Sequence, residues 1–125
     1  MPLPKKKRIL IIEDEKPIAD AEKLILQEQY SVDVALDGDA GLDKIRKTKP
    51  DLVVLDLMLP RRGGYDICFH LRQDATLQDI KVLMVTAKNQ PIDKEKGVMV
   101  GTDGYLTKPF EPQELLQRVT SLLRQ

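Results

Sequence analysis

The sequence lacks most of the features that would assign it to a specialised class of protein. It has one cysteine in 125 residues, which excludes an internal disulfide bond and fits a reducing compartment such as the cytoplasm. Lysine and arginine together number 20, as do aspartate and glutamate, so the net charge is zero. That balance gives no bias toward nucleic acid or an anionic membrane. No apolar run approaches the roughly 18 residues of a membrane-spanning helix. We therefore expect a cytoplasmic domain that contacts neither membranes nor nucleic acid directly.

No repeat, linker or low-complexity tract divides the sequence. A length of 125 residues suits one domain and is too short for two ordinary ones. The basic run from Lys5 to Arg8 is followed by a short apolar stretch, Ile9 to Ile12, and then by acids, which does not fit a signal peptide. We expect a single domain over residues 1–125, with a solvated leader over residues 1–6 and an ordered core over about residues 7–123.

Short apolar runs alternate with amphipathic segments along the chain. The runs predict strands at residues 8–12, 31–35, 52–55, 81–85 and about 105–106. The amphipathic segments predict helices at about residues 17–28, 38–47, 64–72, 91–98 and from 112 onward, with a turn at Asp37 and Gly38. Strands that alternate with helices indicate a parallel sheet with helices on both faces, which is a doubly wound α/β fold.

Helical periodicity predicts which side chains face the core. In the first helix the residues expected to point inward are Ile18, Ala21, Leu24 and Ile25. In the second and third helices they are Leu42, Ile45, Ile67, Cys68 and Leu71. Cys68 is therefore expected to be a core residue. His70 falls off this stripe and is expected at the surface.

Functional side chains end or follow four of the predicted strands. Glu13 and Asp14 follow the first strand, and Asp56 ends the third. Thr86 follows the fourth strand and Lys108 follows the fifth. Because the carboxyl ends of parallel strands lie along one edge of the sheet, this fold would bring the five side chains together.

Their residue types suit the acceptance of a phosphoryl group. Three carboxylates at one edge raise one another's pKa, whereas a hard divalent cation such as Mg²⁺ keeps them ionised. An aspartate can attack phosphorus without a base, because it is already ionised near neutral pH. Lys108 and Thr86 could then stabilise the transferred oxygens. A purely structural interpretation also stays open, in which Glu13 and Asp14 only stabilise the start of the next helix.

The sequence resembles the receiver domain of bacterial two-component response regulators. The resemblance spans about Lys7 to Leu123 and depends on four segments that occur in the family's order. They are Ile-Ile-Glu-Asp-Glu at residues 11–15, Asp-Leu-Val-Val-Leu-Asp-Leu-Met-Leu-Pro-Arg-Arg-Gly-Gly at 51–64, Val-Thr-Ala at 85–87 and Asp-Gly-Tyr-Leu-Thr-Lys-Pro-Phe at 103–110. The resemblance implies the flavodoxin-like (βα)5 fold, a five-stranded parallel sheet of order 2-1-3-4-5.

The resemblance also implies a role for each matching residue at the acidic site. Asp56 would be the phosphoacceptor, and Asp14 and Asp56 would bind Mg²⁺, or Mn²⁺, directly. The backbone carbonyl of Met58 would be the third protein ligand, and Glu13 would contact the metal through water. Lys108 would contact the phosphoryl group.

Signalling roles follow from the same resemblance. Thr86 and Tyr105 match the paired switch residues, and the bond from Lys108 to Pro109 is expected to be cis. The phosphoryl donor would be a sensor histidine kinase or a phosphotransfer protein. The output would pass through the fourth helix, fifth strand and fifth helix to an effector domain or target protein. Such a domain is not an enzyme in the usual sense, although it takes part in its own phosphotransfer and autodephosphorylation.

One position departs from the family pattern. Members fused to winged-helix DNA-binding domains usually carry two acids before the switch aromatic, and here the second is Gly104. Arg118 matches the basic partner of that acid, so a salt bridge across the usual dimer would be missing. We expect a monomer, or a weak dimer that forms on activation.

Three other functions can be weighed against these residues. A phosphatase or phosphomutase with an aspartate nucleophile needs a second aspartate two residues on, where this chain has Met58. A nucleotide or flavin binder needs a glycine-rich or hydroxyl-rich loop after the first strand, where Glu13, Asp14 and Glu15 would repel phosphate. A receiver-like module that is never phosphorylated and only docks would be expected to lose the acids or the lysine, and none is lost here.

Overall fold

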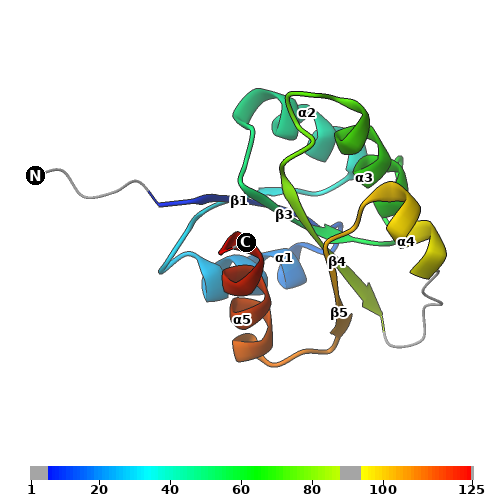
Figure 1. The fold of residues 1–125 in the computed structure, drawn as a ribbon. Helices are drawn as coiled ribbons and strands as arrows, with labels where there is room; N and C mark the ends of the chain where they lie inside the picture. Colours follow the sequence, from blue (N-terminus) through cyan, green and yellow to red (C-terminus); the bar gives the residue numbers. More distant parts are fainter. Residues whose placement is uncertain (1–5, 88–93, 125) are drawn as a thin grey trace, which may run out of the picture.

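Five short strands lie side by side in the computed structural model, which describes residues 6–87 and 94–124 (Figure 1). Their bounds are β1 (Arg8–Ile12), β2 (Ser31–Ala35), β3 (Leu52–Asp56), β4 (Lys81–Ala87) and β5 (Gly104–Lys108). Every neighbouring pair is parallel, and the order across the sheet is β2-β1-β3-β4-β5. The predicted doubly wound sheet of order 2-1-3-4-5 is therefore confirmed.

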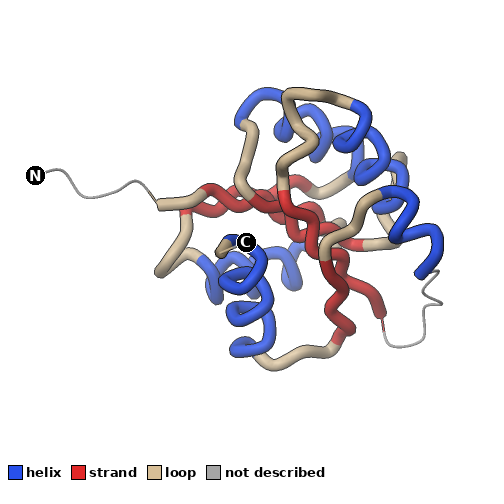
Figure 2. Tube along the Cα trace, viewed as in Figure 1, coloured by secondary structure: helices blue, strands red, loops and turns tan. Residues whose placement is uncertain are grey.

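The helices divide between the two faces of this sheet (Figures 1 and 2). They are α1 (Lys16–Leu26), α2 (Gly38–Thr48), α3 (Gly64–Gln73), α4 (Lys94–Val100) and α5 (Pro112–Leu123). Helices α1 and α5 pack against each other on one face, while α2, α3 and α4 follow one another across the opposite face. Each crossover between strands therefore contains a helix, as parallel pairing requires.

Local side-chain chemistry fixes where two of the helices begin. The Asp37 carboxylate accepts a hydrogen bond of 2.8 Å from the backbone N–H of Ala40, which caps α2. Gly38 is therefore the first residue of α2, where the helix predicted at about residues 38–47 begins, and of the two predicted turn residues only Asp37 precedes the helix. In α5 the side chains of Glu111 and Glu114 form a reciprocal capping box. Pro112 is the first residue of this helix, where its missing N–H loses no hydrogen bond.

Strands β4 and β5 are longer than the apolar runs predicted. Strand β4 ends at Ala87 rather than at residue 85, and β5 ends at Lys108. Their last residues pair as Thr86 with Thr107 and Ala87 with Lys108. Thr86 and Lys108 therefore lie inside strands rather than after them, because the hydrogen-bonded ladder continues past the apolar residues.

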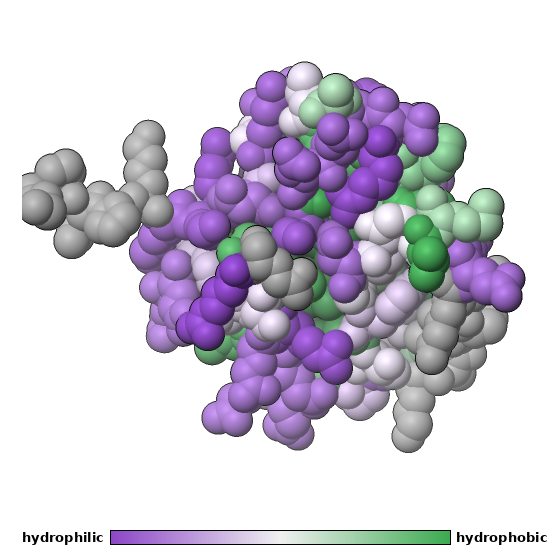
Figure 3. All heavy atoms as spheres, in the orientation of Figure 1, coloured by the Kyte–Doolittle hydropathy of each residue, from purple (hydrophilic) through white to green (hydrophobic). Residues whose placement is uncertain are grey.

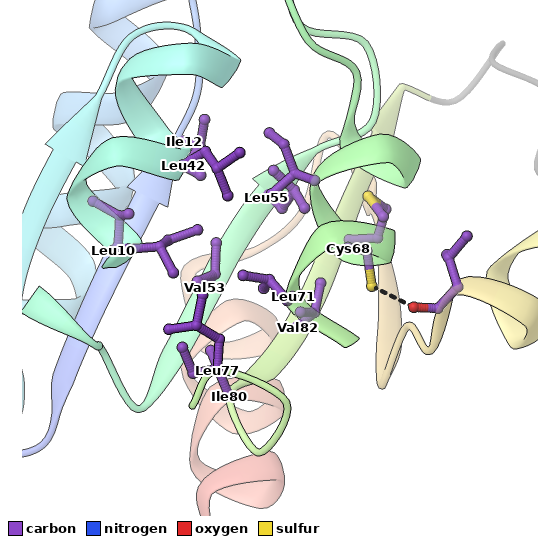
Figure 4. Close-up of a cluster of buried hydrophobic side chains, with 14 of the residues drawn as sticks. Leu10, Ile12, Leu42, Val53, Leu55, Cys68, Leu71, Leu77, Ile80 and Val82 are labelled. Carbon is purple, nitrogen blue, oxygen red and sulfur yellow. Dashed lines mark hydrogen bonds between the residues drawn. The ribbon is translucent and has the colours of Figure 1, made fainter. Parts of the chain in front are cut away.

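The core consists of two apolar clusters, one on each side of the sheet, because strand residues alternate between its faces. Leu10 and Val53 belong to the cluster under α2, α3 and α4, whereas Ile11 and Val54 belong to the cluster under α1 and α5. Cys68 is fully buried in the first cluster, as predicted. Its thiol donates a 3.1 Å hydrogen bond to the carbonyl oxygen of Val100, which joins α3 to the end of α4 (Figure 4).

The predicted inner face of α1 is only partly correct, because Ile25 packs against the core but Ala21 and Leu24 do not. Ala21 is exposed, and the side chain of Leu24 is 67% exposed. The residues that face the sheet are Ala19, Glu22 and Leu26. This stripe lies next to the one predicted from apolar residues, and it was overlooked because its central member is a carboxylic acid.

Most of the surface drawn in Figure 3 is hydrophilic, and hydrophobic side chains interrupt it in the region of α4. Val98 and Met99 of α4 are both more than 80% exposed. The helix predicted at residues 91–98 continues to Val100, while residues 91–93 lie outside the described part of the chain. Among the described residues, no helix is both long and apolar enough to cross a membrane.

Candidate functional site

Strand register brings the predicted site residues to one edge of the sheet. Ile12, the last residue of β1, pairs with Leu55, so Glu13 and Asp56 follow at the same level. Asp56 pairs with Val85, which places Thr86 one residue further along β4. Lys108 occupies the same end of β5.

Alternation along the strands separates these side chains into two groups. Alternate residues of a strand point to the same face of the sheet. Asp56 is two residues after Val54, and Lys108 is two residues after Leu106, so both point toward the face covered by α1 and α5. Thr86 has the same parity as Met84 and points toward the opposite face, where α4 lies. The acids and the lysine therefore lie on one face of the sheet and the hydroxyl on the other.

The acidic part of the site is a close cluster of three carboxylates. Oxygen atoms of Glu13, Asp14 and Asp56 all lie within 4.8 Å of one another. The side chains of Glu13 and Asp56 are buried, at 1% and 8% exposure, whereas Asp14 is exposed. The cluster therefore opens to solvent on the side of Asp14, where an ion could enter.

Hydrogen bonds hold the carboxylate of Asp56 in place. Its Oδ1 accepts a 3.2 Å hydrogen bond from the backbone N–H of Met58. The backbone behind it is fixed, because the N–H of Leu57 donates to the carbonyl of Val85 at 2.9 Å. The other carboxylate oxygen, Oδ2, lies 3.5 Å from the ammonium of Lys108.

Lys108 forms the positive part of the site. Its Nζ donates a 2.7 Å hydrogen bond to Oε1 of Glu13 and lies close to Asp56. Burial lowers the pKa of Lys108, but the hydrogen bond that it donates to Glu13 and the charge of Asp56 outweigh this effect, so the pKa is raised. Lys108 therefore stays a cation at every pH at which the carboxylates can ionise. The peptide bond between Lys108 and Pro109 is cis.

The ammonium of Lys108 alone does not balance the charge of the three carboxylates at this site, as the pKa of Glu13 indicates. The pKa of Glu13 is raised to about 8, mainly by burial and also by the neighbouring Asp56, against the opposing effect of Lys108. Its second oxygen, Oε2, is buried and has no hydrogen-bond partner among the described residues. A buried, unpaired carboxylate oxygen beside two further carboxylates fits a hard divalent cation such as Mg²⁺.

The two predicted switch residues both carry buried hydroxyl groups. Thr86 is fully buried, and its Oγ1 has no hydrogen-bond partner in the described structure. The hydroxyl of Tyr105 is buried as well, and it lies where a side chain on Gly97 of α4 would otherwise extend. Both hydroxyls could accept a new partner, although the structure does not join them directly.

The chain departs from the family pattern at Gly104, and Arg118, which would pair with an acid there, has another partner. Gly104 begins β5, and Arg118 of α5 donates a 3.0 Å hydrogen bond to the backbone carbonyl of Tyr105. The remaining acid, Asp103, accepts 2.8 Å and 2.7 Å hydrogen bonds from Arg72 and from the N–H of Val82. Asp103 therefore fixes the start of β5 to α3 and β4.

Sequence reasoning missed one acid near the site. Glu22 is 2% exposed on the sheet-facing stripe of α1, between Ala19 and Leu26. The signal available in the sequence was its spacing of three and four residues from these two small or apolar neighbours.

Known proteins resemble this chain in sequence and in fold. The family model described as the response regulator receiver domain matches residues 9–120. The transcriptional regulatory protein DltR of Streptococcus agalactiae serotype III (strain NEM316) is 44% identical over 94% of this chain and 52% of its own length. The DNA-binding dual master transcriptional regulator RpaA of Synechocystis sp. is 47% identical over 94% of this chain and 49% of its own length. The chain thus spans about half the length of these curated relatives.

Solved structures agree with the sequence matches. The response regulator receiver domain protein (CheY-like) from Methanospirillum hungatei JF-1 has a TM-score of 0.88 and 30% identity, covering 96% of this chain and 95% of that one. Chemotaxis protein CheY4 of Vibrio cholerae has a TM-score of 0.87 and 29% identity, covering 94% and 98%. The family model spans most of the chain and includes every strand of the site, so this chain belongs to the response regulator receiver domain family.

Proposed function

We propose that this receiver domain accepts a phosphoryl group on Asp56 from a sensor histidine kinase or a phosphotransfer protein. The observation that carries the proposal is the setting of the Asp56 carboxylate, which lies 3.5 Å from the Lys108 ammonium and within the cluster formed with Glu13 and Asp14. A nucleophile, a cation and a metal-binding set of acids therefore converge at one partly open edge. No residue in a general-base role is required, because an ionised carboxylate attacks directly.

Mg²⁺, or Mn²⁺, fits this site as its metal. Asp14, Asp56 and the backbone carbonyl of Met58 would hold the ion, and Glu13 would contact it through water. When bound, the ion would neutralise charge on the carboxylates and on the incoming phosphoryl oxygens.

The protein's own groups would stabilise the remaining phosphoryl oxygens. Lys108 lies nearer to Glu13, at 2.7 Å, than to Asp56, at 3.5 Å. A phosphoryl group on Asp56 would offer the ammonium a new anionic partner, and the buried hydroxyl of Thr86, which has no hydrogen-bond partner among the described residues, could donate a further hydrogen bond. Incubation with acetyl phosphate and Mg²⁺ tests this proposal. The expected product is one acid-stable, base-labile phosphoryl group per chain, and no incorporation would contradict the proposal.

The signal would leave the site through Thr86 and Tyr105. The hydroxyl of Thr86 moves toward the phosphoryl oxygens, and the vacated space admits the ring of Tyr105. Two packings of one cluster form a bistable element that phosphorylation can bias. The affected surface is α4, β5 and α5, which would meet an effector domain or a target protein. DltR and RpaA are named as transcriptional regulators, which supports an effector of that kind.

Thr86→Ala should separate phosphorylation from this output. The alanine variant keeps Asp56, Lys108 and the acids, so it should still bind beryllofluoride, a phosphoryl mimic. It lacks the hydroxyl that couples the site to Tyr105. In the wild-type chain, amide shifts on adding beryllofluoride should extend across residues 94–108. In Thr86→Ala they should stay near residues 13, 14 and 56. Shifts of equal reach in both proteins would refute the coupling.

The isolated domain should be a monomer at micromolar concentration and should dimerise only weakly when activated. A two-fold dimer would use each acid–base pair twice, but Gly104 supplies no acid to Arg118. Exposed ion pairs contribute about 0–1 kcal/mol each, so losing two weakens a dimer by up to about thirtyfold. Sedimentation of the beryllofluoride-activated chain measures this, with Gly104→Asp as the variant that restores the acid. A tight dimer of the unaltered chain, with dissociation well below micromolar, would contradict the prediction.

A further inference from the structure

Glu22 is a buried carboxyl group that has no part in the function proposed above. Its side chain is 2% exposed, and its Oε2 has no hydrogen-bond partner among the described residues. Ala19 and Leu26, which flank it on the inner stripe of α1, belong to the apolar cluster beneath α1 and α5. Burying an unpaired polar group is costly, so a position that served packing alone would favour an apolar side chain.

The topology places Glu22 on the face of the sheet toward which the phosphoacceptor site points. Helix α1 packs on the same face of the sheet toward which strand alternation directs Asp56 and Lys108. Glu13 has the same parity as Ile11 and belongs to this face as well. Glu22 therefore lies on the same side of the sheet as the nucleophile, the cation and one further acid.

Apolar side chains of β1, β2 and α5 pack on the face of α1 that carries Glu22. The elements packed against α1 present apolar side chains there: Ile9 and Ile11 of β1, Val32 and Val34 of β2, and Leu115 and Val119 of α5. The pKa of Glu22 is raised to about 7, mainly by burial, with the ammonium of Lys108 opposing the rise and the carboxylate of Asp56 adding to it. Glu22 thus interacts with both charged partners of the proposed reaction.

We propose that Glu22, on the buried face of α1, acts electrostatically on the phosphoacceptor site. Its negative charge favours binding of the metal cation and opposes the added charge of the phosphoryl group. It contacts none of the reacting atoms and acts through the field it exerts on Asp56 and Lys108, so it is not a catalytic residue. This inference depends on the proposed function of Asp56.

Glu22→Gln removes the charge while keeping the size of the side chain. At about pH 8.5, where Glu22 is ionised, we expect Mg²⁺ affinity to fall by roughly threefold or more, since the lost charge attracted a dication. At saturating Mg²⁺, beryllofluoride affinity should rise by roughly twofold or more, since the same charge opposed an anion. Both differences from the wild-type chain should shrink as the pH falls below about 7, where Glu22 takes up a proton. The chain has no tryptophan, so calorimetry follows Mg²⁺ and fluorine NMR follows beryllofluoride.

Stability gives an independent readout. The folded-state pKa of Glu22 lies above its unfolded value, so the wild-type chain loses stability as the pH rises through about 7. Glu22→Gln should lack this loss and unfold at a higher temperature than the wild-type chain at about pH 8.5. Glu22→Met removes the same charge without leaving an amide. Like Glu22→Gln, it should lower Mg²⁺ affinity and raise beryllofluoride affinity.

Asp20→Asn is the matched control. Asp20 lies on the same helix, is exposed and pairs with Lys16. The asparagine variant therefore removes the same charge, but away from the buried face of the helix. Its affinities should match those of the wild-type chain. Unchanged affinities in Glu22→Gln, or shifts of the same sign for Mg²⁺ and beryllofluoride, would overturn the proposal. Failure of the function itself would look different, because the wild-type chain would then not bind beryllofluoride.

Discussion

Asp14→Ala is expected to weaken Mg²⁺ binding by about tenfold or more, on the order of 1.4 kcal/mol. Asp14 is the exposed member of a cluster whose carboxylate oxygens lie within 4.8 Å of one another. Mg²⁺ binds proteins through few carboxylates, so removal of one of two direct ligands removes a large share of the protein's contribution. The two buried acids would then hold the ion with only a single direct carboxylate, that of Asp56.

Glu15→Ala is the control for this measurement. Glu15 is adjacent in sequence, exposed and of the same charge, and it precedes α1 without making a side-chain cap. Its oxygen atoms are not part of the cluster of three carboxylates found in the described residues. Calorimetric titration should therefore show a small effect at Glu15 and a large one at Asp14. Equal losses in the two variants would favour the interpretation in which these acids only stabilise the start of a helix.

The position of the site could be predicted from the sequence because topology determines it. Asp56 and Lys108 are far apart in the chain, yet each ends a parallel strand, and parallel strands end at one edge of a sheet. The strand order followed from the resemblance to receiver domains. These two inferences brought the acids, the hydroxyl and the lysine together before any contact was known.

The exact ends of β4 and β5 could not be predicted in the same way. The apolar runs stop before Thr86 and before Lys108, but the pairing of Thr86 with Thr107 continues the ladder. Where a ladder ends depends on the neighbouring strand, and the local sequence does not contain that information.

The inner face of α1 was missed for a different physical reason. Periodicity identifies a buried stripe by its apolar residues, and the true stripe carries Glu22 at its centre. The apolar Ala21 and Leu24 then drew the prediction to the neighbouring stripe, which is exposed. A buried acid near a site of high charge is the kind of local exception that functional sites produce.

The proposed nucleophile makes the second large prediction. Asp56→Asn should abolish phosphorylation by acetyl phosphate and Mg²⁺, because a carboxamide does not attack phosphorus as a carboxylate does. Asparagine is close in size to aspartate and can still accept the 3.2 Å hydrogen bond from the N–H of Met58. The fold of the variant should therefore be preserved, which a thermal unfolding curve verifies.

Asp51→Asn provides the matched substitution on the same stretch of chain. Asp51 immediately precedes β3, at the end opposite Asp56, and its Oδ2 accepts a 2.7 Å hydrogen bond from the N–H of Arg8. The asparagine oxygen can accept the same bond. This variant loses one carboxylate, as Asp56→Asn does, but it loses it away from the site, so its phosphorylation should match that of the wild-type chain.

Intact-mass spectrometry of the three proteins after incubation with acetyl phosphate and Mg²⁺ tests the role of Asp56 most directly. The wild-type chain and Asp51→Asn should each gain one phosphoryl group that is stable in acid and lost in base. Asp56→Asn should gain none. Phosphorylation of Asp56→Asn at the wild-type level would place the acceptor on another residue and contradict the function proposed for this site.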